Sequence, residues 1–227
     1  LSGKDLSGAS LWYASFKNTN LKNTNLNGAD LMMTDLSKIK NKSLAGADLT
    51  NTSLAHSNLS DVDLSGVILM ETNFWKADLS GQDFTVVSNS NLSEPRENES
   101  ITNDAPRVSG TIFIEANLSN SNFEGVDLRP DLIGDYIIKN KAYLKNLDGQ
   151  ELLDGLFPTH KNANLHLISK QVRGNDLVVS FIIYNNFNTA NLENANFKNA
   201  GLMFVDFYTA NLTNADLEGA NLSRSNL

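Results

Sequence analysis

The hydrophobic positions of this chain recur with a period of five residues. Leu or Phe stands at every fifth position from Leu1 to Leu36, and again from Leu44 to Phe84. A small side chain, most often Ala, Thr or Ser, lies two positions before most of them, and Asn, Asp or Ser usually lies between the two. The same pattern returns in Ala116-Asn117-Leu118 and recurs from Ala190 to Leu227. Much of the chain is therefore built from one repeated unit.

A period of five fits neither an α-helix nor a straight strand. Residues five apart are rotated by about 140° on a helix, and they lie on opposite faces of a strand. They share one side only if the chain bends the same way once per repeat, so that coils form and stack at about 4.8 Å. The sequence predicts an all-β solenoid. Its predicted inward core includes Leu11, Phe16, Leu21, Leu26, Leu31, Leu49, Leu54, Leu59, Leu64, Phe74, Leu118, Phe123, Leu192, Phe197, Leu212 and Leu217.

The tandem pattern Ala-Asp/Asn-Leu-x-x is specific enough to suggest a family. Copies such as Ala190-Asn191-Leu192 and Ala215-Asp216-Leu217 resemble the pentapeptide-repeat family, and the resemblance covers well over half of the chain. It implies a right-handed, four-sided β-helix with about 20 residues in each coil. Beyond the fold, the resemblance assigns no functional role to any residue.

Residues 1–128 are expected to form coils with two interruptions, a short one at residues 37–43 and a longer one at residues 85–107. Residues 37–43 shift the phase by three positions, which predicts a solvated bulge at a corner or a small basic contact patch. Its lysines are Lys38, Lys40 and Lys42. Residues 85–107 lack apolar periodicity and predict a long loop, either a tolerated insertion or a partner-binding segment.

The third interruption, residues 129–166, contains too many apolar residues for a loop and predicts a small subdomain packed on the coils. Part of its apolar spacing fits a helix, through Ile133, Tyr136, Ile137, Leu144 and Leu147. The apolar runs around residues 173–176 fit a β-hairpin. A competing pattern stands five apart and in phase with the last repeats, at Leu167, Val172, Leu177, Ile182 and Phe187. This phase predicts that residues 167–227 form the C-terminal coils.

Composition and charge limit the partners. The chain holds 18 Lys and Arg against 26 Asp and Glu, and its net charge of −8 favours a basic protein partner over nucleic acid. Without Cys it can form neither a disulfide nor a thiolate metal site. No apolar run reaches the length of a membrane span, so no membrane partner is expected. Leu1 already lies in the repeat, so the sequence leaves open what precedes it and which compartment it occupies.

Candidate chemistry is sparse. Asp154, His160 and His166 together suggest a metal site, but their spacing matches no known ligand pattern, and His56 occupies an outward repeat position. Nucleophile elbows, phosphate-binding Gly loops and dinucleotide fingerprints are all missing from the sequence. The outward Asp residues arise from the repeat itself. The sequence thus predicts no catalytic residue, no cofactor, no metal and no enzymatic activity.

Two non-enzymatic functions are compatible with these features. The favoured hypothesis is an interaction scaffold for a protein partner, in which the insertions, especially residues 130–165, carry recognition. The alternative is a DNA mimic that binds or protects a type II topoisomerase such as gyrase, as quinolone-resistance members of the resembled family do. An uncovered final coil also predicts a homodimer as one way to cover open strand edges.

Acid placement tests the alternative. A phosphate mimic needs continuous acidic rows, whereas like charges directly opposite one another destabilise adjacent strands. At a 20-residue spacing, acids mostly stack on Ser or Asn, as in Ser10–Asp30 and Asn58–Asp78, and the one clear acidic pair is Asp63–Asp83. The sequence therefore favours the scaffold hypothesis.

Overall fold

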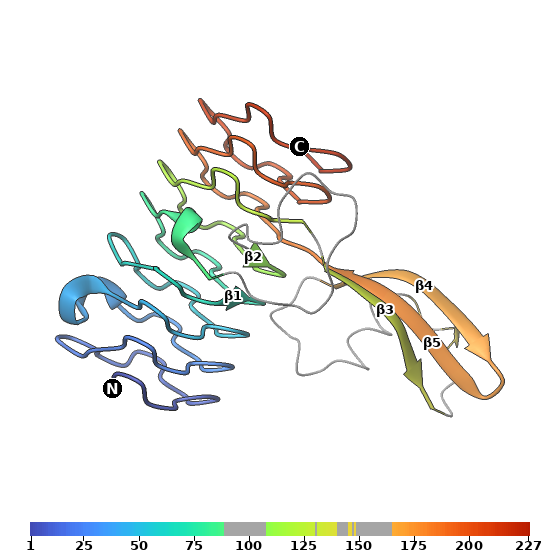
Figure 1. Ribbon diagram of the computed structural model, residues 1–227, viewed down its shortest axis with the longest axis horizontal. Helices are drawn as coiled ribbons and strands as arrows, with labels where there is room; N and C mark the ends of the chain where they lie inside the picture. Colours follow the sequence, from blue (N-terminus) through green and yellow to red (C-terminus); the bar gives the residue numbers. More distant parts are fainter. Residues whose placement is uncertain (89–107, 130, 140–144, 147, 149–164) are drawn as a thin grey trace.

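The computed structural model describes residues 1–88, 108–129, 131–139, 145–146, 148 and 165–227. They form a stack of coils, and a three-stranded sheet projects from the side of the stack (Figure 1). Most of the stack is held by isolated bridges between coils rather than by long strands. The named elements are η1 (Leu36–Lys38), η2 (Lys40–Lys42), β1 (Leu69–Met70), η3 (Phe84–Val86), β2 (Val108–Ser109), β3 (Asp131–Ile138), β4 (Leu165–Arg173) and β5 (Asp176–Ile183).

Each repeat combines one bridge residue with one β-turn, and this combination produces the period of five. Asp5 pairs in parallel with Asn25, and the Leu6 N–H donates to the Asn25 carbonyl at 2.8 Å. The Leu6 carbonyl then accepts from the Ala9 N–H at 3.1 Å, which closes a turn whose third residue, Gly8, has a φ of 65°. Gly adopts this left-handed φ without steric cost. The chain therefore bends once after each Leu or Phe.

One coil takes 20 residues, which is the length of four pentapeptides. The Asn25 side chain donates to that of Asp5, 20 residues earlier, at 3.0 Å. Across the three interruptions, the separation of stacked side chains rises to 23, 39 and 74 residues, in the pairs Thr34–Ser57, Asp78–Asn117 and Asn117–Asn191. The same ladders continue past every interruption, so the insertions leave the coil register unchanged.

Leu and Phe side chains fill the interior of the coils. Phe113 stacks between Phe74 and Phe187, with ring centroids 5.5 and 4.6 Å apart, and Phe123 stacks between Phe84 and Phe197 at 4.3 and 4.8 Å. Of the inward residues named from the sequence, Leu11, Leu212 and Leu217 are partly buried, and the others have at most 5% of their surface exposed. The partly buried ones lie in the outer coils.

The first interruption forms two consecutive 3-10 turns. η1 and η2 meet at Ile39, which is buried, and Asn41 takes a left-handed φ of 60°. The Lys40 N–H donates to the Thr19 carbonyl of the preceding coil at 2.9 Å. The bulge therefore stays hydrogen-bonded to the stack while its lysines lie on the surface.

The chain on the two sides of residues 89–107 belongs to one coil. The Ser88 N–H donates to the Val67 carbonyl at 2.8 Å, and β1 then pairs in parallel with β2, with Leu69 opposite Val108. Ser88 and Val108 thus stand at consecutive positions of the stack. Most of the loop expected from the sequence lies outside the described residues, except for its first turn, η3.

The projecting sheet has the strand order β3-β5-β4, and both pairings are antiparallel. β4 and β5 are joined at Gly174, which has a φ of 65°, and they form the hairpin that the sequence predicted around residues 173–176. Lys139, which follows β3, forms an ion pair with Asp176 at 2.8 Å. The strands of the sheet are the longest in the described part of the chain.

The prediction of a helix from residue 133 onward is wrong for the residues that the structure describes. Ile133, Tyr136 and Ile137 lie in β3, where Ile133 pairs with Phe181 and Ile137 with Val178 of β5. Pairing with β5 satisfies the backbone of this segment, and tertiary pairing overrides a weak helical pattern. Leu144 and Leu147 lie outside the described residues.

The predicted return of the coil at residue 167 is also wrong. Residues 165–183 form β4 and β5, and coil pairing begins again at Asn186, whose N–H donates to the Thr111 carbonyl at 3.1 Å. Val172 and Leu177 stand five apart because they face each other across the hairpin. Their spacing matches the coil period without placing them in the coil.

Candidate functional site

One corner of the coil carries bulky side chains in almost every layer. We call it the aromatic corner, and it consists of the turn pairs Trp12-Tyr13, Met32-Met33, Ala55-His56, Trp75-Lys76, Ile114-Glu115, Asn188-Thr189 and Tyr208-Thr209. Successive pairs are joined by backbone hydrogen bonds, from Tyr13 to Met32 at 3.2 Å, Met33 to Ala55 at 2.9 Å and His56 to Trp75 at 2.8 Å. The pairs therefore form one continuous column.

The second residue of each pair has a left-handed backbone, with φ between 54° and 59°. None of these residues is Gly or Asn, whereas the other corners mostly use those types at the same turn position, as at Gly8, Asn23 and Gly66, with exceptions such as Glu71 and Phe204. A left-handed φ costs a residue with a Cβ about 1–2 kcal/mol, and Gly and Asn bear this cost most easily. Local strain of this kind clusters at functional sites. The aromatic corner is thus a candidate binding surface.

Several side chains of the aromatic corner are open to solvent. Trp12, Tyr13, Met33 and Tyr208 have 52, 61, 38 and 56% of their surface exposed. The rings of Trp12 and Tyr13 lie against each other, with centroids 4.9 Å apart. Single exposed apolar residues such as Tyr208, at the far end of the column, are ordinary, but Trp12, Tyr13 and Met33 lie in two adjacent layers, and such a contiguous group marks an interaction surface.

Polar contacts hold Trp75 in the middle of the aromatic corner. Its indole N–H donates to the Glu115 carboxylate at 3.3 Å, the Lys76 ammonium lies 4.7 Å from the ring centroid, and His56 meets the ring edge-on. Lys76 also forms an ion pair with Glu115 at 3.2 Å. The hydrogen bond from Trp75, followed by that from Lys76, lowers the pKa of Glu115. Trp75 is therefore preorganised.

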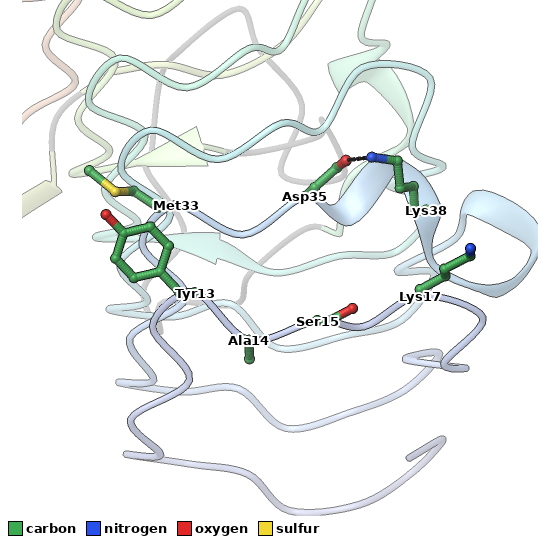
Figure 2. Close-up of a pocket in the computed structure, with 7 residues that line it drawn as sticks. All are labelled: Tyr13, Ala14, Ser15, Lys17, Met33, Asp35 and Lys38. Carbon is green, nitrogen blue, oxygen red and sulfur yellow. Dashed lines mark ion pairs between the residues drawn. The ribbon is translucent and has the colours of Figure 1, made fainter.

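A hollow of about 420 Å³ opens beside the N-terminal end of the aromatic corner (Figure 2). Tyr13 and Met33 form one flank of this N-terminal hollow, and Lys17 and Lys38 form the opposite flank. Small or short side chains lie between the flanks, namely Ala14, Ser15 and Asp35. The hollow thus has an apolar side and a basic side.

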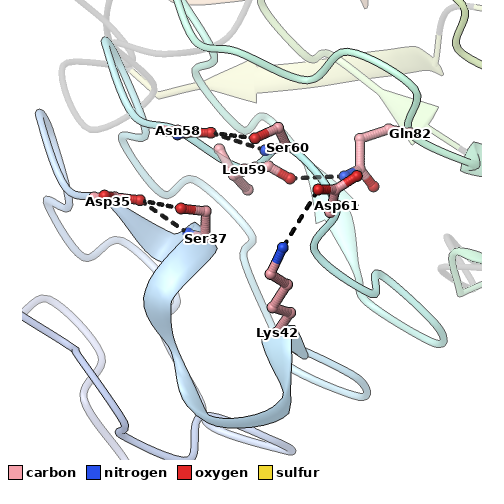
Figure 3. Close-up of polar contacts among 8 residues, drawn as sticks. All are labelled: Asp35, Ser37, Lys42, Asn58, Leu59, Ser60, Asp61 and Gln82. Atoms are coloured by element: carbon pink, nitrogen blue, oxygen red, sulfur yellow. Dashed lines mark hydrogen bonds and ion pairs between the residues drawn. The ribbon is translucent and has the colours of Figure 1, made fainter.

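The basic flank is anchored by the bulge beside it. Asp35 accepts from the Ser37 N–H at 3.2 Å and forms an ion pair with Lys38. These contacts, Lys38 first, lower the pKa of the Asp35 carboxyl. Lys17 forms no ion pair with any residue that the structure describes. Further contacts in this region join Lys42 to Asp61 and Gln82 to the Leu59 carbonyl (Figure 3).

The junction between the coil and the projecting sheet is buried and polar. Arg129 binds Asp127 through two contacts, at 2.8 and 3.0 Å, and both side chains are nearly buried. The fully buried Asn185 donates to the Leu128 carbonyl at 2.9 Å and accepts from the Thr111 N–H at 2.9 Å. One side chain therefore ties together the places where the chain leaves and re-enters the stack.

A family model for pentapeptide repeats matches the chain in eight copies. The matched residues, more than half of the chain, are 1–38, 47–85, 107–129 and 186–227. The chain belongs to the pentapeptide-repeat family. This family implies a right-handed β-helix, and its members are generally structural or interaction proteins rather than enzymes. No curated protein matches the sequence.

Several solved pentapeptide-repeat structures are similar to this protein. HetL from Nostoc sp. strain PCC 7120, described as involved in heterocyst differentiation regulation, is 21% identical over 100% of this chain and 84% of its own, with a TM-score of 0.29. A thylakoid lumen protein of Arabidopsis thaliana is 24% identical over 56% of this chain and 63% of its own, with a TM-score of 0.24. QnrB1, a plasmid-mediated fluoroquinolone resistance protein, is 15% identical over 99% of this chain and 89% of its own, with a TM-score of 0.28.

Acidic residues alternate with neutral ones along the ladders of this pentapeptide-repeat protein. In the bridges of the described coils, each acid pairs with Asn, Ser, Ile or Gly, as in Asp5–Asn25, Ser10–Asp30, Asp48–Ile68, Asp83–Asn122 and Asp127–Gly201. Asn amides also donate to carboxylates of the neighbouring coil, as Asn226 does to Asp206 at 3.1 Å. This arrangement disperses negative charge along the stack.

The metal site considered from the sequence lies mostly outside the described residues. Asp154 and His160 lie outside the described residues, His166 belongs to β4, and His56 contacts Trp75 in the aromatic corner. Within the described ranges, no group of three or more His, Asp or Glu residues is placed to hold a metal ion. No helix in this part of the chain is long and apolar enough to cross a membrane.

The aromatic corner was missed in the sequence analysis, although a signal for it exists. Trp12 and Met32 stand one coil apart, and Ala55 and Trp75 again stand one coil apart, at turn positions that elsewhere hold Ser, Lys or Asn. The three extra residues of the bulge hide the link between Met32 and Ala55. Comparing turn positions after correcting for that shift would have found the column.

Proposed function

We propose that this pentapeptide-repeat protein is a non-enzymatic scaffold that binds a protein partner through the segment inserted at residues 129–166 and the sheet it joins. The coil serves as a rigid support, and we infer a four-sided cross-section because each 20-residue coil contains four turns. The inserted segment and the sheet form the small subdomain that presents the recognition surface.

The observation that carries this proposal is the set of buried polar contacts where the chain leaves the coil for the sheet and returns to it. The Asp127–Arg129 pair lies just before β3 and Asn185 lies just after β5, and the buried hydrogen bonds of Asn185 to Leu128 and Thr111 hold the two ends of the insertion together at the stack. A rigid attachment reduces the ordering cost of binding. The sheet also extends away from the stack (Figure 1).

The edges of this sheet supply a physical means of recognition. Among the described strands, β3 and β4 each pair on one side only, with β5 between them. An unpaired strand edge accepts a further strand through main-chain hydrogen bonds. A partner that adds an extended segment to β3 or β4 would fit this arrangement.

The alternative of a DNA mimic directed at a type II topoisomerase has less support. It would require rows of adjacent carboxylates, but each acid in the described bridges pairs with a neutral residue, and Asp63–Asp83 is the one clear acidic pair at the coil spacing. A homodimer through an end coil stays a prediction: Leu217 and Leu222 are partly buried and Leu227 is exposed in the last coil.

The structure allows a deletion that removes the sheet and preserves the coil. Removing residues 130–183 joins Arg129 to Tyr184 and shortens the Asn117–Asn191 separation from 74 residues to the 20 of an ordinary coil. Removing residues 89–107 is the matched control, because it shortens the Asp78–Asn117 separation from 39 residues to the same 20.

The full chain and both deletions would be used to capture partners from source-cell lysate, after thermal melting has shown that each protein folds. We expect a partner that is retained by the 89–107 deletion and lost with the 130–183 deletion. A partner retained by both deletions would overturn the proposed role of the inserted segment, and a retained topoisomerase would favour the DNA mimic.

A further inference from the structure

The N-terminal hollow has two chemically different flanks on one side of the coil. Tyr13 and Met33, from successive layers of the aromatic corner, face it from one corner, and Lys17 and Lys38 face it from the next (Figure 2). Each flank therefore recurs in two stacked layers. A ligand that fits would meet an apolar wall and a basic wall at the same time.

The distance between the flanks limits the shape of a ligand. Lys17 lies four residues after Tyr13 along the chain, and residues in extended conformation advance about 3.3 Å each. The apolar and basic flanks are therefore at most about 13 Å apart. An extended peptide places two side chains at that separation, and on one face, when they are about four residues apart.

The N-terminal end of the protein carries a net positive charge, whereas the whole chain carries a net negative charge. Residues 1–45 contain six Lys and three Asp, although the complete chain has a net charge of −8. One of these three acids, Asp35, is already engaged by Lys38 and Ser37. Lys17 has no ion-pair partner among the described residues, so its ammonium is open to an external carboxylate. Complementary charge directs such a partner to this surface.

The apolar flank is suited to anchor a side chain. Tyr13 has 61% and Met33 38% of its surface exposed, and both are held at left-handed φ values of 54° and 59° where Gly or Asn would cost less. Aromatic and Met side chains gain much of their contact energy by covering an apolar partner group. The strained turns thus keep two contact side chains at the rim of the hollow.

We propose that the N-terminal hollow binds an acidic, extended segment of a partner protein, which places an apolar side chain against Tyr13 and Met33 and a carboxylate against Lys17, beside the Asp35–Lys38 ion pair. This surface is separate from the projecting sheet, and the proposal does not depend on the role of that sheet. The partner is acidic, opposite to the basic partner that net charge alone would suggest.

The test selects peptides of about 12 residues from a random displayed library on the immobilised full chain. We expect a consensus with Asp or Glu about four residues from an aromatic or aliphatic residue. A dye-labelled peptide of that consensus would then be titrated by fluorescence anisotropy. Absence of a consensus, or a consensus without acids, would overturn the proposal.

Comparing the affinity of the selected peptide for variants inside and outside the hollow tests whether the peptide binds there. Tyr13→Ser and Lys17→Glu should each weaken the selected peptide by about tenfold or more. Val86→Ser, at an exposed apolar residue of η3 outside the aromatic corner, and Lys4→Glu, with the same charge change, should leave affinity within about twofold. Equal binding by all four variants would refute the assignment. Circular dichroism verifies that each variant folds.

A membrane surface is the competing occupant, because Trp, Tyr and Lys also favour lipid interfaces. Sedimentation with vesicles of phosphatidylcholine and phosphatidylserine tests it. We expect no co-sedimentation. Vesicle binding that is lost in Tyr13→Ser and Lys17→Glu would replace the acidic peptide with an anionic lipid surface and overturn the proposal.

Discussion

The Asn185 side chain bonds to the Leu128 carbonyl at 2.9 Å and so closes the base of the projecting sheet. The same side chain accepts from the Thr111 N–H at 2.9 Å in the preceding coil, and it is fully buried. Asn185 occupies the position two residues before Phe187, where most repeats carry a small side chain. The departure from the repeat therefore has a structural cause.

Asn185→Ala should destabilise the protein strongly. It removes two buried hydrogen bonds, which we expect to lower the free energy of unfolding by about 2–4 kcal/mol. Denaturant unfolding measures the change. Asn211→Ala is the control, since its side-chain bond to Asn191 at 3.1 Å is exposed and should matter by less than about 1 kcal/mol. Equal effects of the two substitutions would contradict the role of Asn185.

Phe123→Ala should open a cavity in the centre of the stack. Phe123 is fully buried between Phe84 and Phe197, and a Phe to Ala change in such a place costs about 3–5 kcal/mol. The melting temperature and the denaturant midpoint should both fall. Tyr208→Ala removes an exposed ring and should change stability by less than about 0.5 kcal/mol. A loss below 1 kcal/mol for Phe123→Ala would speak against the stacked core.

Thr189→Asn should stabilise the protein, because Thr189 holds a left-handed φ of 56° with a β-branched side chain. Asn tolerates this conformation better, and we expect a gain of about 0.5–1 kcal/mol in the free energy of unfolding. Thr213→Asn serves as the control, since Thr213 is exposed and lies outside the left-handed positions of the described turns. Destabilisation by Thr189→Asn would show that the Thr side chain contributes a compensating contact.

The hydrogen bond between Trp75 and Glu115 should depend on pH. Because the pKa of Glu115 is lowered below the ordinary value of 4.5, its contribution is complete above that value and is lost as pH falls through the folded pKa. In a Trp12→Phe background, Trp75 fluorescence should titrate with a midpoint below 4.5. Glu115→Gln should remove this transition, and a transition that persists in that variant would assign it to another group.

The five-residue spacing of apolar residues predicts the solenoid but not where the solenoid is interrupted. The five-residue spacing of Leu and Phe is a local property, and bending once per repeat is the only way to bury such a series, so the solenoid follows from the sequence. Val172 and Leu177 share that spacing but face each other across a hairpin. Two apolar residues five apart can therefore belong either to successive repeats of a coil or to a pair across a hairpin. Only the pairing between distant segments distinguishes these two arrangements.

The candidate binding surfaces could not be found from the sequence, because their residues come together only when the coils stack. Tyr13, Met33 and His56 lie 20 and 23 residues apart in the chain, and they become one column only when the coils stack with the bulge excluded. The sequence by itself determined the repeat, the inward core and the absence of long acidic rows, because each depends on residues within one or two repeats. The tertiary structure decided where the coil resumes, how Asn185 ties the sheet to it and which turns share a corner, because those depend on pairing between segments separated by as many as 74 residues.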